Sequence, residues 1–263
     1  MNRSTIDAGP ARLSSVATAL RLLKLFSAEE PELGITAMAA RLGVAKSTAH
    51  RLASTLVAEG FLEQNPADGR YRLGLGLFAL GTLVRRRMDV SEQAVPQLHA
   101  LGALTGETVH LAVLHGAEIL YLRNIDSPHA IRPRSYLGVR MPAHCTGEGR
   151  ALLAFSPPAV ASELLRAKLQ PRTPHTVTDK DRLAQLLARV RASGHAIDDE
   201  ESELGMRGVA APIFDAGGAV VAAVGVVGPV QRVSKPALRQ LAQQVTAAAA
   251  RISARLGHGP APE

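Results

Sequence analysis

Several residue types are scarce in this sequence, and each scarcity excludes a class of function. The chain of 263 residues has no Trp, one Cys and an aromatic content of 3%. The single cysteine, Cys145, rules out an intramolecular disulfide framework and any zinc or iron–sulfur site built from several cysteines. With so few aromatic rings, a stacking platform for single-stranded nucleic acid is not expected. These absences favour a protein of the reducing cytoplasm with an aliphatic core.

Long apolar runs are missing as well. The longest, such as residues 220–227, are far shorter than the roughly 20 residues that a membrane helix needs. Residues 1–10 are polar and do not form the charged and then apolar pattern of a signal peptide. We therefore expect a soluble cytoplasmic protein that has no membrane partner.

The sequence does have hydrophobic residues and positive charge. Its hydrophobic content of 46% is enough for a sizeable core, and its length suits one large domain or two ordinary ones. Residues 1–88 carry 12 Lys and Arg against 7 Asp and Glu, which accounts for most of the net charge of +7. A polyanionic partner is therefore expected at the N-terminal part of the chain.

This N-terminal part predicts a definite order of elements. Apolar residues at helical spacing, and a turn with Pro and Gly at residues 65–69, predict three helices and a hairpin. The expected elements cover residues 14–27, 37–42, 46–60, 61–64 and 70–73. Thr36 offers a hydroxyl cap for the second helix, and Gly43 ends that helix. The order is typical of a winged helix-turn-helix.

The third of these helices carries the side chains that a helix needs to read a DNA groove. Ser47, His50 and Arg51 share one face near the helix N-terminus, where backbone N–H groups also favour phosphate. The alternative is a solvated face on an ordinary helical domain. The residues predicted to contact DNA are Thr36, Lys46, Ser47, Thr48, His50, Arg51, Arg70 and Arg72.

Four short motifs, taken together and in order, resemble the IclR family of bacterial transcriptional regulators. They are SVATAL at residues 15–20, KSTAHRL at 46–52, GFL at 60–62 and GRYRLG at 69–74. Ala45 departs from the family pattern, since a Pro often precedes the Lys-Ser-Thr motif. Ala39 stands where a Glu commonly closes a capping box. Neither departure removes a group expected to contact DNA.

The resemblance covers nearly the whole chain and implies a second, GAF-like domain that binds a small-molecule effector. Alternating helix and strand signals there predict a mixed α/β (α+β) fold with an antiparallel sheet. Helices are expected near residues 91–104, 147–155, 179–192 and from 234 onward, and strands near 108–114, 118–124, 208–214 and 219–227. The expected domains are a winged helix-turn-helix at 12–74, a linker and dimerisation helix at 75–88, and the effector-binding domain at 89–257.

The family motifs also imply an effector pocket. The residues expected to line it are Pro133, Met141, Gly147, Glu148, Asp198, Gly208, Gly225 and Val227. Some relatives have Ser or Cys at the last three positions, so this chain is expected to have a roomier and more apolar pocket for an aromatic or otherwise bulky organic acid. Candidates to neutralise the carboxylate of that acid are Arg132, Arg134, Arg140 and His144.

Two other features suggest chemistry at first sight. Asp198–Glu201 is an acidic run, which we interpret as a solvated loop or helix start rather than a metal site. Cys145 follows His144, but adjacency in sequence supplies neither a positioned base nor a lowered pKa, and a buried cysteine is the commoner case. No catalytic residue, metal or cofactor is predicted.

The sequence thus predicts a transcription factor that binds a double-stranded operator and is controlled by a small organic acid, with repression as the default sign. A homodimer or homotetramer is implied by the family resemblance. One alternative is a small-molecule enzyme with an N-terminal regulatory module. Another is a nonspecific architectural DNA-binding protein, which would not need the large and nearly neutral second domain.

Overall fold

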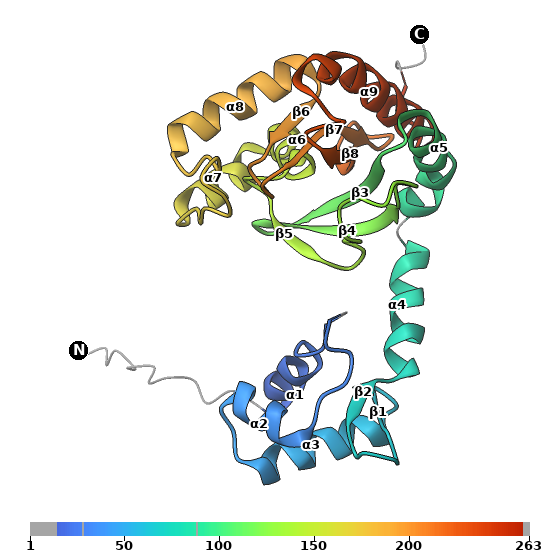
Figure 1. The fold of residues 1–263 in the computed structure, drawn as a ribbon, viewed down its shortest axis with the longest axis vertical. Coiled ribbons are helices and arrows are strands. Elements are labelled where there is room, and N and C mark those ends of the chain that lie inside the picture. The colour runs from blue at the N-terminus through green and yellow to red at the C-terminus, as the bar shows by residue number, and fades with distance from the viewer. Residues whose placement is uncertain (1–14, 28, 88, 260–263) are drawn as a thin grey trace, which may run out of the picture. The chain divides into compact units, whose positions relative to one another are not determined.

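The computed structural model describes residues 15–27, 29–87 and 89–259 (Figure 1). The chain divides into two compact units, Met1–Arg87 and Met88–Glu263, and each is described by itself. Within the described ranges, no helix is both long enough and apolar enough to span a bilayer.

The first unit consists of helices and one small antiparallel hairpin. Its elements are α1 (Ser15–Leu23), α2 (Ile35–Leu42), α3 (Lys46–Ala58), β1 (Leu62–Gln64), β2 (Tyr71–Leu73) and α4 (Leu75–Arg87). Leu22, Leu52 and Tyr71 are among the buried residues of its core, so helices and hairpin share one apolar interior. Leu33 joins the hairpin through an isolated bridge to Tyr71, with both N–H to O distances at 2.9 Å.

The predicted order of this unit is confirmed, with differences at the helix ends. The first helix ends at Leu23 and the third at Ala58, earlier than the apolar spacing predicted. The cap predicted at Thr36 is wrong, because α2 already begins at Ile35 and Gly34 is its N-cap. Residue 14, with which the first predicted helix begins, lies outside the described residues.

The second unit is built on one antiparallel sheet of strand order β5-β4-β3-β8-β7-β6. The strands are β3 (Thr108–His115), β4 (Glu118–Ile125), β5 (Arg140–Pro142), β6 (Ala196–Asp199), β7 (Met206–Phe214) and β8 (Val220–Pro229). The helices are α5 (Asp89–Thr105), α6 (Gly147–Phe155), α7 (Pro158–Arg166), α8 (Lys180–Ser193), the short 3-10 helix η1 (Lys235–Ala237) and α9 (Leu238–Arg255).

Helices cover both faces of this sheet, as Figure 1 shows. On one face, α5 and α9 pack on alternate strand residues such as Val109 and Leu111. On the other face, α6 packs over residues such as Ala112 and Ala210, and α7 and α8 pack against α6. Because successive residues of a strand point to opposite faces, β3 contributes to both cores. The predicted mixed α/β fold is confirmed.

Three elements of this unit are absent from the sequence prediction: β5, α7 and β6. The interpretation of Asp198–Glu201 as a solvated loop or helix start is wrong. Asp198 and Asp199 belong to β6, where Asp198 pairs in register with Gly208 of β7, and Asp198 and Glu201 are both buried. A four-residue edge strand that ends in two acidic residues has too little apolar alternation to be recognised from its pattern.

Candidate DNA interface and effector cavity

Helix α3 has one buried and one exposed face. Ala49, Leu52 and Leu56 are buried against the rest of the first unit. The opposite face exposes the predicted DNA contacts Lys46, Ser47, His50 and Arg51, and Thr48 is half-buried beside them. The apolar stripe thus fixes the helix so that its polar face is turned to solvent.

The start of α3 leaves backbone donors available. Gly43 adopts a left-handed conformation, with φ of 67°, and its turn leads directly into the helix. The N-cap residue, Ala45, makes no side-chain capping hydrogen bond. Helix N-terminal N–H groups without an intrahelical partner are natural donors to a phosphate oxygen. Thr36 is exposed in the first turn of α2.

The cations of the interface differ in their partners. Within the described part of the chain, neither Lys46 nor Arg51 forms an ion pair. On the hairpin, Arg72 Nη2 lies 2.8 Å from Glu63 Oε2, whereas Arg70 Nε lies 3.8 Å from Asp68 Oδ2. Arg51 therefore has its charge available for a DNA contact, and Arg72 shares its charge with a neighbour.

The second unit contains a small cavity of about 20 Å³ against the α6 side of the sheet. It is lined by His110, Tyr121, Pro133, Tyr136, Met141, Gly147, Glu148, Asp198, Ser202, Glu203, Met206, Gly208, Val209, Val226 and Val227. All the residues predicted to line a pocket are among these except Gly225. This space is little larger than a water molecule, so side chains must move to admit an organic ligand.

The space expected from the small residues Gly208 and Gly225 is not left open, and the lining is not only apolar. The lining carries the carboxyl groups of Glu148, Asp198 and Glu203. Gly225 does not leave open space, because a Cβ placed there would overlap the carboxylate of Glu148. The glycine instead makes room for a charged side chain from α6. A Cβ at Gly208 would lie 2.8 Å from the carbonyl oxygen of Val226, so this glycine is required by close backbone packing.

Asp198 is one of the buried carboxyl groups of this lining. Burial raises its pKa to about 6, although hydrogen bonds to the carboxylate oppose the rise. Its Oδ1 accepts hydrogen bonds from the backbone N–H of Glu201 at 2.9 Å and of Ser202 at 3.2 Å. The group thus ties β6 to the loop that follows it.

Three rings form an aromatic wall of the cavity. The His110 ring centroid lies 4.8 Å from that of Tyr121 and 5.4 Å from that of Tyr136, both in edge-on arrangements. The Tyr136 hydroxyl donates a hydrogen bond to Glu203, and burial together with this carboxylate raises the pKa of Tyr136 to about 12. Burial also raises the pKa of Tyr121 well above its ordinary value. Both phenols are therefore neutral hydrogen-bonding groups at neutral pH.

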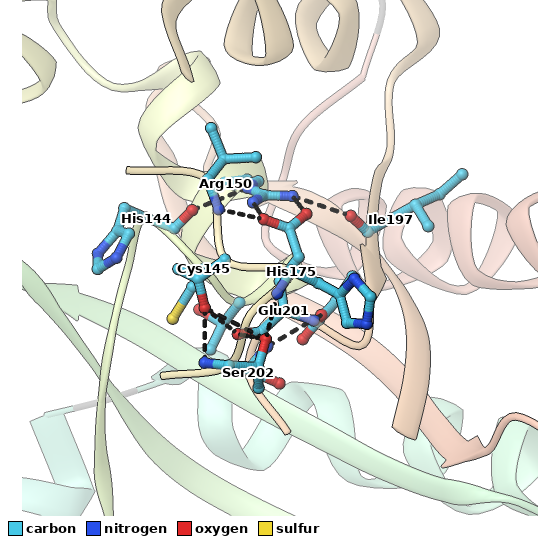
Figure 2. A network of polar contacts seen from close by, with 12 residues as sticks. His144, Cys145, Arg150, His175, Ile197, Glu201 and Ser202 are labelled. Atoms are coloured by element: carbon cyan, nitrogen blue, oxygen red, sulfur yellow. Dashed lines mark hydrogen bonds and ion pairs between the residues drawn. The ribbon is translucent and has the colours of Figure 1, made fainter. Parts of the chain in front are cut away.

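A buried ion pair holds the segment that carries Asp198 (Figure 2). Arg150 of α6 donates from Nη1 to Glu201 Oε1 at 2.6 Å and from Nη2 to the other carboxylate oxygen. The guanidinium also donates to the carbonyl oxygens of His144 at 2.8 Å and Ile197 at 3.2 Å. The Val177 N–H donates to Glu201 Oε2 at 3.0 Å. Both charges are thus compensated, as buried charges must be.

The four candidates for neutralising an effector carboxylate lie in different surroundings. Arg134 stands with its Cζ 5.6 Å from the ring centroid of Tyr136, a cavity-lining residue. Arg132 donates to the carbonyl oxygen of His129, Arg140 Nη1 lies 3.7 Å from Glu118 Oε2, and His144 Nε2 lies 3.1 Å from the carbonyl oxygen of Gln170. Arg134 is thus the candidate in contact with the aromatic wall.

Cys145 is a free and buried thiol, and its burial raises the pKa to about 12. At neutral pH it is protonated and therefore a poor nucleophile. Among the described residues, no group of three or more His, Cys, Asp or Glu side chains could hold a metal ion.

The residues that sequence reasoning missed are mainly the aromatic wall and Glu203. His110 did leave a signal, since it is a polar residue inside the apolar strand pattern of residues 108–114. The two tyrosines left none, because their approach to His110 depends on strand pairing and on the loop before β5.

Two models of known protein families match the chain. Residues 15–66 match the family model of the IclR helix-turn-helix domain. Residues 82–254 match the model described as bacterial transcriptional regulator IclR C-terminal.

Similar proteins match along almost their full length. The HTH-type transcriptional regulator XynR of Escherichia coli is 35% identical over 94% of this chain and 98% of its own. The DNA-binding transcriptional repressor YiaJ, also from E. coli, is 30% identical over 94% of this chain and 89% of its own. The structure of an IclR homolog from Microbacterium hydrocarbonoxydans, complexed with 4-hydroxybenzoate, has a TM-score of 0.82 and 30% identity over 92% of this chain and 99% of that one.

Proposed function

The chain belongs to the IclR family of bacterial transcriptional regulators, and from this premise we propose that it is a repressor whose operator binding is controlled by a small organic acid. DNA binding is the role of the first unit, and effector binding is the role of the second. The observation that carries the proposal is the exposed face of α3, where Lys46 and Arg51 stand without an ion-pair partner among the described residues.

In this proposal, α3 enters the major groove of the operator. Ser47, His50 and Arg51 would read base edges, while Lys46 and the N-terminal N–H groups of α3 would hold a phosphate. Thr36, Thr48, Arg70 and Arg72 would add contacts to the DNA backbone. Arg72 must give up part of its pairing with Glu63 to do so, which makes its contribution smaller.

The effector would occupy the cavity of the second unit. An organic acid is supported by the relative crystallised with 4-hydroxybenzoate and by the position of Arg134 against the aromatic wall. Arg134 would bind the carboxylate of the effector, since a guanidinium matches the geometry of a carboxylate. The remaining cavity residues would then face the rest of the molecule.

The operator-binding form is proposed to be a homodimer, or a homotetramer made of two such dimers. Helix α4 exposes Leu75, Phe78, Leu80 and Leu83, and Phe78 is 73% exposed. Exposed apolar side chains gathered on one helix are typical of an interaction surface. We therefore retain a winged helix-turn-helix at 12–74, a linker and dimerisation helix at 75–88 and an effector-binding domain at 89–257. A symmetric dimer would read a pseudo-palindromic operator.

Control by the effector requires that the ligand bind one quaternary state more tightly than another. A coupling of about 1 to 3 kcal/mol between the two sites is typical of such regulators. Repression is supported by the relative named as a transcriptional repressor. A regulator of operator DNA works where the chromosome lies, so we place the protein in the cytoplasm.

The second unit is proposed to bind its ligand without transforming it. The protonated state of Cys145 and the structural pairing of Glu201 with Arg150 leave both residues unsuited to catalysis. Binding alone accounts for the contacts that the cavity offers.

A selection of genomic DNA fragments on the purified protein tests the proposal. We expect enrichment of a pseudo-palindromic site, and a loss or gain of affinity for that site when a cognate organic acid is added. Equal affinity for every fragment would contradict sequence-specific regulation and favour an architectural DNA-binding protein.

A further inference from the structure

One nitrogen atom in the second unit lacks a partner. Nε2 of His110 is, within the described part of the chain, the buried side-chain polar atom that makes no hydrogen bond. The side chain is 2% exposed and lines the effector cavity. Buried polar atoms in proteins are almost always paired, so an unpaired one at a cavity wall points to a group supplied from outside the chain.

The other nitrogen of this ring faces a carboxylate. His110 Nδ1 lies 3.5 Å from Oε1 of Glu148, whose side chain is also buried. This approach depends on β8, because His110 pairs in register with Gly225 and the missing side chain there leaves the space that the Glu148 carboxylate fills. With the Glu148 carboxyl group beside Nδ1, that nitrogen already has a polar neighbour, and Nε2 is the ring atom left for a group in the cavity.

The rest of the lining is also rich in acceptors. Asp198 and Glu203 add two further carboxyl groups, and no Lys or Arg is among the described residues that line the cavity. A keto, aldehyde or carboxylate group can only accept hydrogen bonds, so it offers no donor to the carboxyl groups of this lining. A hydroxyl donates and accepts at low desolvation cost, whereas a buried ammonium group loses far more hydration.

We propose that His110 and Glu148 form a hydroxyl-recognition pair, so that the effector is a hydroxy acid rather than an acid without a hydroxyl. This inference rests on the proposed organic-acid effector. The hydroxyl donates its proton to Nε2 or to the Glu148 carboxylate, while the acid group lies at the Arg134 end of the aromatic wall. The pair thereby determines specificity and leaves DNA contacts unaffected.

Isothermal titration of the full-length protein with matched acids tests the pair. The probes are 4-hydroxybenzoate against benzoate, and glycerate against propionate. We expect the hydroxylated member of at least one pair to bind about tenfold more tightly or better, because the analogue without the hydroxyl leaves the buried Nε2 unpaired. A third probe, 4-(aminomethyl)benzoate, presents an ammonium group and is expected to bind more weakly than 4-hydroxybenzoate.

Two variants separate recognition from folding. His110→Phe keeps a ring against Tyr121 and Tyr136 but removes both nitrogens, and Glu148→Gln keeps the shape of the side chain while removing its charge. Each is expected to weaken binding of the hydroxylated probe about tenfold and that of its partner by less than about twofold. His99→Phe, an exposed histidine on α5, serves as the matched control and keeps the wild-type ratio.

A spectroscopic readout identifies the nitrogen directly. The nitrogen-15 resonance of His110 Nε2 is expected to shift when the hydroxylated probe binds and to stay in place with the other probe, which a merely structural histidine would not show. Equal affinities within both pairs, equal losses in both variants, or tighter binding of the ammonium probe would overturn the hydroxyl pair alone. Failure of every acid to bind a protein that still binds DNA would overturn the proposed organic-acid effector as well.

Discussion

The carboxylate of Glu148 occupies the place that a side chain at Gly225 would take. One residue lies in the first turn of α6 and the other in the middle of β8, and the absence of a Cβ in the strand permits the acid from the helix. The chemistry of the cavity wall is thus set jointly by two positions that are far apart in the chain.

Gly225→Ala should therefore destabilise the protein. The added methyl group displaces the Glu148 side chain from a closely packed site, and overpacking of this kind costs about 1 to 3 kcal/mol. Chemical denaturation with urea measures the loss. Gly81→Ala, at a helical site where a Cβ meets nothing within 4 Å, is the control and should stabilise slightly.

Shortening the side chain at Glu148 should relieve the overlap that Gly225→Ala creates. The double variant Gly225→Ala, Glu148→Ala should be more stable than the sum of the two single changes predicts, because the second change removes the atoms that the first displaces. Strict additivity would contradict the packing relation between the two positions.

Arg51→Ala should weaken binding to the specific operator more than binding to random DNA. Loss of a base contact costs about 1 to 3 kcal/mol of discrimination. Fluorescence anisotropy with both duplexes, at one fixed salt concentration, gives the ratio. Arg72→Ala should have a smaller effect on the operator, since Glu63 already shares its charge.

Arg239→Ala is the matched control for both arginine variants, because this arginine is exposed on α9 in the second unit. If Arg51→Ala reduced affinity for operator and random DNA by the same factor, Arg51 would be a phosphate contact rather than a reader of bases.

Asp198 should make stability depend on pH. Burial raises its pKa to about 6, so the folded protein holds this proton more strongly than the unfolded chain does. Protonated Asp198 makes its full contribution to the free energy of unfolding below the pKa of the unfolded chain, near 4. This contribution is lost as the pH rises through the folded pKa of about 6. Asp198→Asn keeps the accepting Oδ1, and its stability relative to wild type should rise by up to about 3 kcal/mol between pH 4 and 7.

The adjacent acid provides a control of opposite sign. The pKa of Asp199 is lowered: burial raises it, but hydrogen bonds and charge from Arg207 and Lys235 outweigh that effect. Its contribution to stability is present above the unfolded pKa and is lost as the pH falls through the folded one. Asp199→Asn should be less stable than wild type near pH 7, and urea denaturation should show this difference becoming smaller as the pH is lowered. A pH-independent difference for Asp198→Asn would contradict the role of its buried carboxyl group.

Phe78→Glu should weaken self-association of the protein and, with it, operator binding. The exposed apolar side chains of α4 are the surface that the proposed dimer would bury, and a charge there opposes burial. Sedimentation equilibrium measures the dissociation constant, which should rise by at least about tenfold. Leu104→Glu, where the leucine is 62% exposed on α5, should leave association unchanged. An unaltered dimer in Phe78→Glu would place the interface elsewhere.

The sequence predicts the first unit well because local patterns decide it. The apolar stripe of α3 and the turn at Gly43 are each readable within a few residues. The cavity was only partly predictable. Its lining positions follow from the family motifs, but its acidic character does not, because only the folded sheet brings Glu148, Gly225 and His110 together.

The acidic run at residues 198–201 shows the same limit. Four acidic residues usually mark solvated chain, and nothing local distinguishes this run from that case. Arg150, which neutralises Glu201, lies 51 residues earlier in the chain. A pairing over that distance depends on the arrangement of β6 and α6, which no periodicity encodes.

Glu148 and Arg150 stand two residues apart in α6, so the same turn of helix presents one side chain to the cavity and another to the Glu201 pair. These two duties can diverge independently. A change at residue 148, made together with one at Gly225, would therefore alter the cavity wall and leave the Arg150–Glu201 ion pair in place. The chemistry of the cavity can be varied at one helix position while the next position but one keeps the wall folded.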